Sequence, residues 1–155
     1  ASGQNTTGAN NTVSGATAMF NNTTGTNNVA FGVNAARYYT ANASLTTVTN
    51  GTFIGYMTKA LANNSTNELV IGYNAQGDGN NTSVIGNSST TQTRVYGNTL
   101  YKTGTATVQW TSGTGSPESV VTANVGSMYT RTDGGAGTTL YVKESGTGNT
   151  GWIAK

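Results

Sequence analysis

The chain has 155 residues, of which 34% are hydrophobic and only 8% are charged, and it contains 22 glycines, one proline and no cysteine or histidine. The formal net charge of +2 is carried by basic residues that are scattered singly, so the chain lacks the clustered positive charge that nucleic-acid binding requires. No apolar run approaches a membrane span, so we expect no membrane insertion, and the missing residue types exclude disulfides, thiolate sites and the usual catalytic base.

Residues 1–99 are dominated by a repeat in which a short apolar pair precedes a glycine. Residues 5–18 and 22–35 are almost tandem copies, and motif glycines stand at positions 15, 32, 55, 72, 86 and 97. Each pair predicts a short β-strand, its glycine permits a tight bend or close backbone packing, and Asn-rich segments supply the turns. Such self-similarity is typical of stacked or intertwined β-structure. The predicted repeat-motif core consists of Phe31, Gly32, Ile54, Gly55, Ile71, Gly72, Ile85 and Gly86.

The longest interval between motif glycines holds residues 37–45, which we interpret as an inserted loop. Aromatic faces beside amide and hydroxyl groups are typical of sugar-binding surfaces, so Tyr38 and Tyr39 in this loop, together with Trp110, are candidate ligand contacts. Tyr56 and Tyr73, which follow motif glycines, are candidates by the same criterion, but we favour a role in which they stack and stabilise the repeat. Further along, residues 77–81 (Gly-Asp-Gly-Asn-Asn) are interpreted as a turn, because one carboxylate is too few for a calcium loop.

Residues 100–117 are interpreted as a connector, because a Gly/Ser/Thr-rich run and the only proline end it. Within it, residues 101–110 have the character of a strand pair broken at Gly104. The following segment, residues 118–155, predicts a small β-meander. Its expected strands cover 125–131, 138–144 and 152–154, and its expected core is Tyr129, Tyr141 and Trp152.

The scarcity of apolar residues bears on assembly. Such a chain cannot fill an ordinary globular core, so it buries its apolar residues in a thin repetitive layer or shares that layer with other copies. We favour sharing and expect a homo-oligomer. The sequence begins without a signal-peptide pattern or a methionine, which suggests a processed chain or a piece of a longer one.

The repeat resembles that of a known group of proteins. The segments NNVAFGVNA (27–35), ELVIGYNA (68–75) and NTSVIG (81–86) resemble the head repeats of trimeric autotransporter adhesins, and similar repeats occur in bacteriophage tail fibres. This resemblance implies an all-β homotrimer whose stalk, residues 1–99, is a short β-solenoid or a set of interwoven strands.

The C-terminal segment carries a second resemblance. Its pattern GSMY (126–129), RTDGG (131–135), LYVK (140–143) and GW (151–152) is similar to the end module of many phage fibre, spike and capsid-decorating proteins. It implies that the stalk and connector are followed by a compact β-meander knob, residues 118–155.

Few residues offer catalytic chemistry. Without histidine, and with no acid whose neighbours suggest a carboxylate pair, we expect a protein that is not an enzyme and has no cofactor or metal site. The resemblances imply a structural protein at the virion surface of a tailed bacteriophage, most simply a tail fibre that attaches to host-surface glycans and contacts other virion structural proteins. Two alternatives stay open: a capsid decoration or head-fibre protein, and a cellular adhesin or secreted filament subunit.

Overall fold

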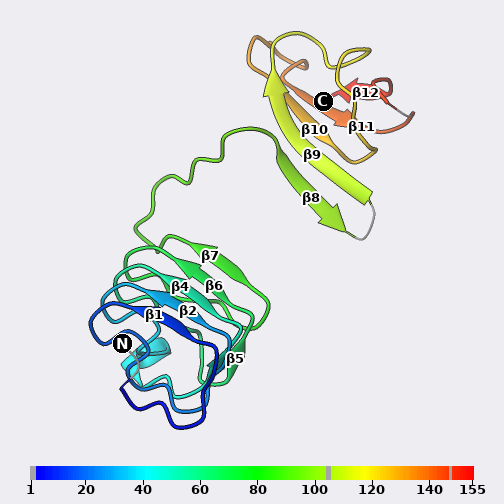
Figure 1. Cartoon of the computed structure of the whole chain (residues 1–155). Helices are drawn as coiled ribbons and strands as arrows, with labels where there is room; N and C mark the ends of the chain where they lie inside the picture. Colours follow the sequence, from blue (N-terminus) through cyan, green and yellow to red (C-terminus); the bar gives the residue numbers. More distant parts are fainter. Residues whose placement is uncertain (1–2, 104–105, 147) are drawn as a thin grey trace. The chain divides into compact units, whose positions relative to one another are not determined.

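The computed structural model describes residues 3–103, 106–146 and 148–155. The protein is all-β, as predicted, and the described residues contain one short 3-10 helix, η1 (Thr40–Asn42). The chain divides into two compact units, a solenoid unit of residues 1–93 and a C-terminal unit of residues 94–155 (Figure 1).

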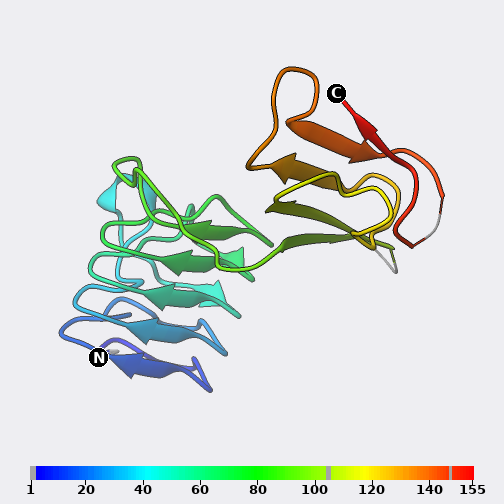
Figure 2. The same ribbon diagram turned by 90° about the horizontal axis from the view of Figure 1, so that it is seen from above.

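The solenoid unit is built from short parallel strands stacked on one another, which confirms the predicted β-solenoid (Figure 2). Its main sheet has the order β1-β2-β4-β6-β7, and every neighbouring pair is parallel. A smaller parallel sheet pairs β3 with β5. The strands are β1 (Thr12–Ser14), β2 (Val29–Phe31), β3 (Val48–Thr49), β4 (Thr52–Ile54), β5 (Ser65–Thr66), β6 (Leu69–Ile71) and β7 (Ser83–Ile85).

The strands of the main sheet are three residues long, so the middle side chain points into the coil and the two flanking ones point outward. The middle positions form one inward column of Val13, Ala30, Phe53, Val70 and Val84. Small side chains from elsewhere in the coils close the core against it, among them Ala18, Ala35, Ala60 and Ala75. This core is thin, as the composition predicts, and Phe53 is its largest side chain.

The motif glycines stack in a second column. Gly15, Gly32, Gly55 and Gly72 have φ values of 131° to 132°, a conformation that L side chains rarely adopt. A Cβ at Gly32 would also lie 2.5 Å from the carbonyl oxygen of Gly55 in the next coil. The predicted role of glycine in close backbone packing is therefore confirmed, and it is the stacking of coils that requires it.

Asparagine supplies the turns that precede the strands, again as predicted. The asparagines two residues before the strands of the main sheet have φ values of 55° to 61°, in the left-handed region that asparagine tolerates. They are Asn10, Asn27, Asn50, Asn67 and Asn81. Their amides bond from coil to coil, with 3.1 Å between Asn10 and Asn27, 3.2 Å between Asn27 and Asn50, and 2.9 Å between Asn67 and Asn81. Asparagine therefore suits this fold twice, because it adopts the backbone conformation of the turns and its side chain bonds to the neighbouring coil.

The predicted insertion at residues 37–45 lies in the coil between β2 and β4. An antiparallel bridge between Tyr38 and Ser44 closes it, and η1 lies inside it. The insertion therefore lengthens one coil without disturbing the parallel pairing of β2 with β4.

The C-terminal unit is a single five-stranded sheet of order β12-β11-β10-β9-β8. Its strands β9 and β10 pair in parallel and the other pairs are antiparallel. The strands are β8 (Thr99–Thr103), β9 (Ala106–Gly113), β10 (Met128–Arg131), β11 (Leu140–Lys143) and β12 (Trp152–Ala154). The predicted core is confirmed: Tyr129, Tyr141 and Trp152 are buried, and the Tyr129 ring meets the other two edge-on, with centroids 6.5 and 6.1 Å away.

The boundary between the units differs from the predicted one. Residues 100–117, expected as a connector, contribute β8 and β9 to the C-terminal sheet, and the units divide at residues 93 and 94. The predicted strand pair over 101–110 is confirmed by the pairing of β8 with β9, whereas the break expected at Gly104 lies outside the described residues. The parallel pairing of β9 with β10 joins segments separated in sequence, which a local turn pattern does not reveal.

Candidate functional site

The outward side of the main sheet carries a column of apolar side chains. Phe31, Ile54, Ile71 and Ile85 are the last residues of β2, β4, β6 and β7 and stand opposite one another in register. We name these four residues, together with the outward-facing Val29 and Leu69, the outer apolar face. Of the predicted repeat-motif core, the glycines are thus close-packed, whereas the apolar members point away from the coil. With a side-chain period of two, only one of two adjacent apolar residues can face inward.

The outer apolar face is uncharged and largely exposed, with Leu69 and Ile71 half-buried. Phe31 is 61% exposed and Ile85 58% exposed. The remaining outward positions of the five strands are Thr12, Ser14, Thr52 and Ser83, so no charge interrupts the surface. Contiguous exposed apolar surface is a feature of interaction sites, which makes this face a candidate for one. Its chemistry is suited to contact with another apolar surface.

Tyr56 and Tyr73 form a stacked pair beside this face. Their ring centroids are 5.5 Å apart with an interplanar angle of 9°, which confirms the prediction that they stack along the solenoid. The equivalent position in the next coil, after Gly86, is Asn87, so the stack ends at Tyr73. Accordingly, Tyr73 is 69% exposed against 44% for Tyr56.

An open cleft of about 580 Å³ lies at the end of this stack. One wall is a turn that Asn87 organises: its amide nitrogen donates to the carbonyl oxygen of Tyr73 at 2.6 Å, and its side-chain oxygen accepts from Ser89 N at 2.8 Å. Its backbone N–H donates to the hydroxyl of Thr90, also at 2.8 Å. The cleft lining includes Tyr73, Asn74, Gln76, Ile85, Asn87, Ser88 and Ser89.

Sequence reasoning does not predict this cleft, because the favoured role of Tyr56 and Tyr73 is stacking along the solenoid. The signal was present in the repeat. Tyrosine follows the motif glycines at Gly55 and Gly72, but asparagine follows Gly86. An aromatic column that stops within the repeat leaves its last ring the more exposed one, and only the stacked structure shows what lies beside that ring.

The candidate contacts Tyr38 and Tyr39 are both partly buried. The guanidinium carbon of Arg37 lies 5.0 Å from the Tyr38 ring centroid and 5.5 Å from that of Phe20, so the Tyr38 ring already has a cation partner. Tyr39 packs against the solenoid core. The two rings therefore contribute to the packing of the inserted loop, and their proposed role in sugar binding stays a prediction.

Trp110, the third candidate contact, lies on β9 in the C-terminal unit and is 50% exposed. Its indole N–H donates to the Thr130 hydroxyl at 3.1 Å. A shallow depression of about 230 Å³ beside it is also lined by Asn98 and Thr99. Trp110 is the most accessible of the three candidates, and its role too stays a prediction.

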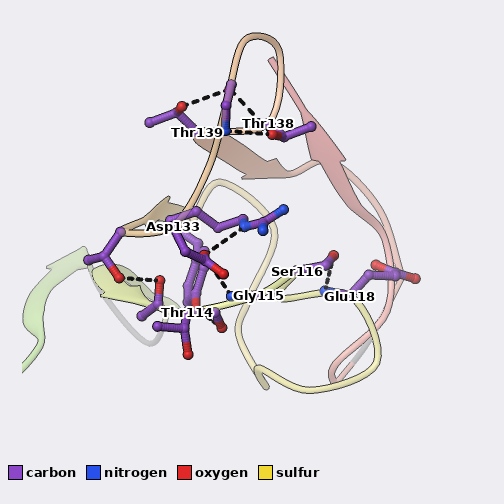
Figure 3. Close-up of polar contacts among 12 residues, drawn as sticks. Thr114, Gly115, Ser116, Glu118, Asp133, Thr138 and Thr139 are labelled. Carbon is purple, nitrogen blue, oxygen red and sulfur yellow. Dashed lines mark hydrogen bonds and ion pairs between the residues drawn. The ribbon is translucent and has the colours of Figure 1, made fainter.

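The acidic groups of the C-terminal unit hold turns in place. The Asp133 carboxylate accepts from Arg131 Nε at 3.0 Å and from Gly115 N at 2.9 Å, and these bonds lower the pKa of Asp133 to about 2 (Figure 3). The same ion pair raises the pKa of Arg131. Glu118 accepts from the backbone N–H groups of Gly151 and Trp152 at 3.2 and 2.8 Å, which ties the start of β12 to residues 117–121.

In the solenoid unit the buried Glu68 has a similar structural role. Its Oε1 accepts from Leu61 N at 3.2 Å and from Gly79 N at 2.8 Å. Residues 79–81 form the bend and turn that lead into β7, in agreement with the predicted turn. Within the part of the chain that the structure describes, no group of three or more His, Cys, Asp or Glu residues is placed to hold a metal ion.

Comparison with known proteins adds no relationship: no family model, curated protein or solved structure matches this chain. Across the described ranges, none of the helices has the length and apolar character needed to cross a membrane. The functional argument therefore rests on the chain's own residues and on the outer apolar face and the cleft that they form.

Proposed function

We propose that this chain is a non-enzymatic structural module of a homotrimeric virion-surface fibre, of the tail-fibre type that attaches a tailed bacteriophage to host-surface glycans. The outer apolar face is the observation that carries the proposal. It presents Val29, Phe31 and Ile54 to solvent from a coil stack whose own core is made largely of alanine. Burying these side chains between copies supplies the apolar contact that one chain lacks.

Other parts of the proposal have different support. The trimeric state and the virion location come from the resemblance of the repeat and of the C-terminal segment to fibre proteins. The repeated coil suits a spacer, because each added coil extends the stack without changing the contacts of the others. Other virion structural proteins are the expected neighbours of such a module.

Light scattering coupled to size-exclusion chromatography tests the association. We expect the mass of three chains for the unaltered protein and the mass of one chain for the double variant Ile54→Asp with Ile71→Asp, because charge on the outer apolar face cannot be buried between copies. The matched control places two aspartates on the smaller sheet, as Thr49→Asp with Thr66→Asp, and should stay trimeric. A stable monomer of the unaltered protein would contradict the assembly.

Location on the particle tests the biological role. A label on the chain should appear at the tail of the intact virion. Labelling of capsid lattice points would instead assign the chain to capsid decoration or a head fibre, and a chain found in no particle would point to a cellular adhesin or a secreted filament. Either of these last results refutes the tail-fibre role.

A further inference from the structure

We propose that the cleft at the end of the Tyr56–Tyr73 stack binds a neutral pyranose saccharide, with Tyr73 as the platform for the sugar ring. This inference rests on the proposed function and gives it a location, since it names a binding site for the attachment step. The site includes none of Tyr38, Tyr39 and Trp110, and it gives Tyr73 a role in ligand contact in addition to the expected stacking.

The unfinished aromatic stack is the first observation. One face of the Tyr73 ring is covered by Tyr56, with ring planes only 9° from parallel. The next coil supplies Asn87 in place of a third ring, and Tyr73, which is 69% exposed, lines the cleft. A pyranose presents a flat face of C–H groups, and such a face docks on an aromatic ring because both are apolar and the ring face is electron-rich.

The second observation is the set of polar groups around that ring. Asn74, Gln76 and Ser88 line the cleft, and their side chains make no hydrogen bond to any residue that the structure describes. Amides and hydroxyls both donate and accept, as sugar hydroxyl groups do. The side-chain composition of the cleft thus matches the two sides of a pyranose, which are one apolar face and a rim of hydroxyls.

The absence of charged residues from the cleft lining and the volume of the cleft limit the class of ligand that it can bind. No acidic or basic residue lines the cleft, so an ionised sugar would lose hydration without gaining an ion pair. The volume of about 580 Å³ falls within the usual range of small-ligand sites. We therefore infer a neutral saccharide and not a phosphorylated or carboxylated one.

The wall formed by residues 87–90 is already organised. Asn87 bonds to Tyr73, Ser89 and Thr90, and a Cβ at Gly86 would overlap the Thr90 side chain, so the turn packs closely on the coil. A site whose wall is ordered before binding loses little conformational freedom when the ligand arrives. The turn therefore acts as a positioning element for the sugar.

Saturation-transfer NMR on the assembled protein tests the site. The probes are maltotriose, cellotriose, mannotriose and tri-N-acetylglucosamine, with sialyllactose as an acidic comparison. We expect at least one neutral trisaccharide to bind and Tyr73→Ala to weaken it about tenfold or more, because stacking and buried apolar area are lost together. Ser88→Trp, which fills the cleft and leaves the stack intact, should weaken the same probe.

Tyr101→Ala is the matched control, since it removes an exposed tyrosine on β8 in the C-terminal unit that neither lines the cleft nor belongs to the stack. Its binding should stay near that of the unaltered protein, and Tyr73→Phe should also retain binding. The proposal is overturned if none of the neutral probes binds, if association of the chains closes the cleft, or if Tyr73→Ala and Ser88→Trp bind like the unaltered protein.

Failure of this inference can be told apart from failure of the proposed function. If the trimer binds host cells and Tyr73→Ala binds them equally well, the cleft is not the attachment site but the fibre role stands. If the chain is monomeric and lies in no virion, the fibre role fails, whereas specific binding of a neutral saccharide at Tyr73 would still establish the site.

Discussion

At the scale of single residues, this fold depends on glycine and asparagine more than on large apolar side chains. The motif glycines allow consecutive coils to approach so closely that a methyl group at Gly32 would overlap the next coil. Asparagine occupies the left-handed corners and bonds from one coil to the next. Both effects act through the backbone, so a sequence poor in apolar residues can still specify a stacked structure.

The glycine column gives a prediction for one residue. Gly32→Ala should destabilise the solenoid unit by about 3 kcal/mol or more, because it combines an unfavourable backbone conformation with a steric overlap. Thermal unfolding followed by far-UV circular dichroism measures the change. Gly135→Ala is the control: a Cβ there has no atom within 4 Å, so the melting temperature should change little. Equal melting of the two variants would refute the role of close stacking.

At the scale of elements, the short strands distribute their side chains strictly by alternation. In the main sheet this leaves the middle residue inside and its neighbours on the outer apolar face. In β11 the same alternation buries Tyr141 and Lys143, and the Lys143 ammonium nitrogen has no hydrogen-bond partner among the described residues. A charged group in such a position costs free energy unless it is paired.

Replacing that lysine tests the cost. Lys143→Met keeps a chain of similar length without the charge, and we expect it to stabilise the C-terminal unit by about 1 to 4 kcal/mol. Tryptophan fluorescence during urea unfolding measures the change. Lys102→Met, at an exposed position of β8, should leave stability within about 0.5 kcal/mol. A loss of stability in Lys143→Met would show that the ammonium group has a partner in the assembled protein.

At the scale of the whole molecule, the chain is two compact units with separate cores. The solenoid core is centred on Phe53 and the C-terminal core on Tyr129, Tyr141 and Trp152. Both tryptophans of the chain, Trp110 and Trp152, belong to the C-terminal unit. Tryptophan fluorescence therefore reports on that unit alone, whereas circular dichroism reports on both.

This difference separates the two units experimentally. Phe53→Ala should destabilise the solenoid unit by about 3 to 5 kcal/mol, because it leaves a cavity in a thin core. We expect a lower midpoint for the circular-dichroism transition and an unchanged midpoint for tryptophan fluorescence. If both midpoints fall together, the two units unfold in one cooperative transition and do not have separate stabilities.

Much of this architecture follows from the sequence alone. The spacing of motif glycines predicts the coils, asparagine predicts the turns, and alternation in residues 125–131 and 138–144 predicts two of the C-terminal strands. These features depend on local backbone preferences, which act over a few residues and leave a readable pattern. The sequence also predicts the aromatic core of the C-terminal unit, Tyr129, Tyr141 and Trp152.

Tertiary structure decided three points that no local pattern contains. The pairing of β9 with β10 moved the expected connector into the C-terminal sheet. The direction of each short strand placed Phe31 and Ile54 on the outside of the coil. The stacking of coils brought the turn of residues 87–89 beside Tyr73, and together they line the cleft. Each depends on contacts between residues far apart in the chain, and a one-dimensional pattern does not specify which face or which neighbour a side chain will have.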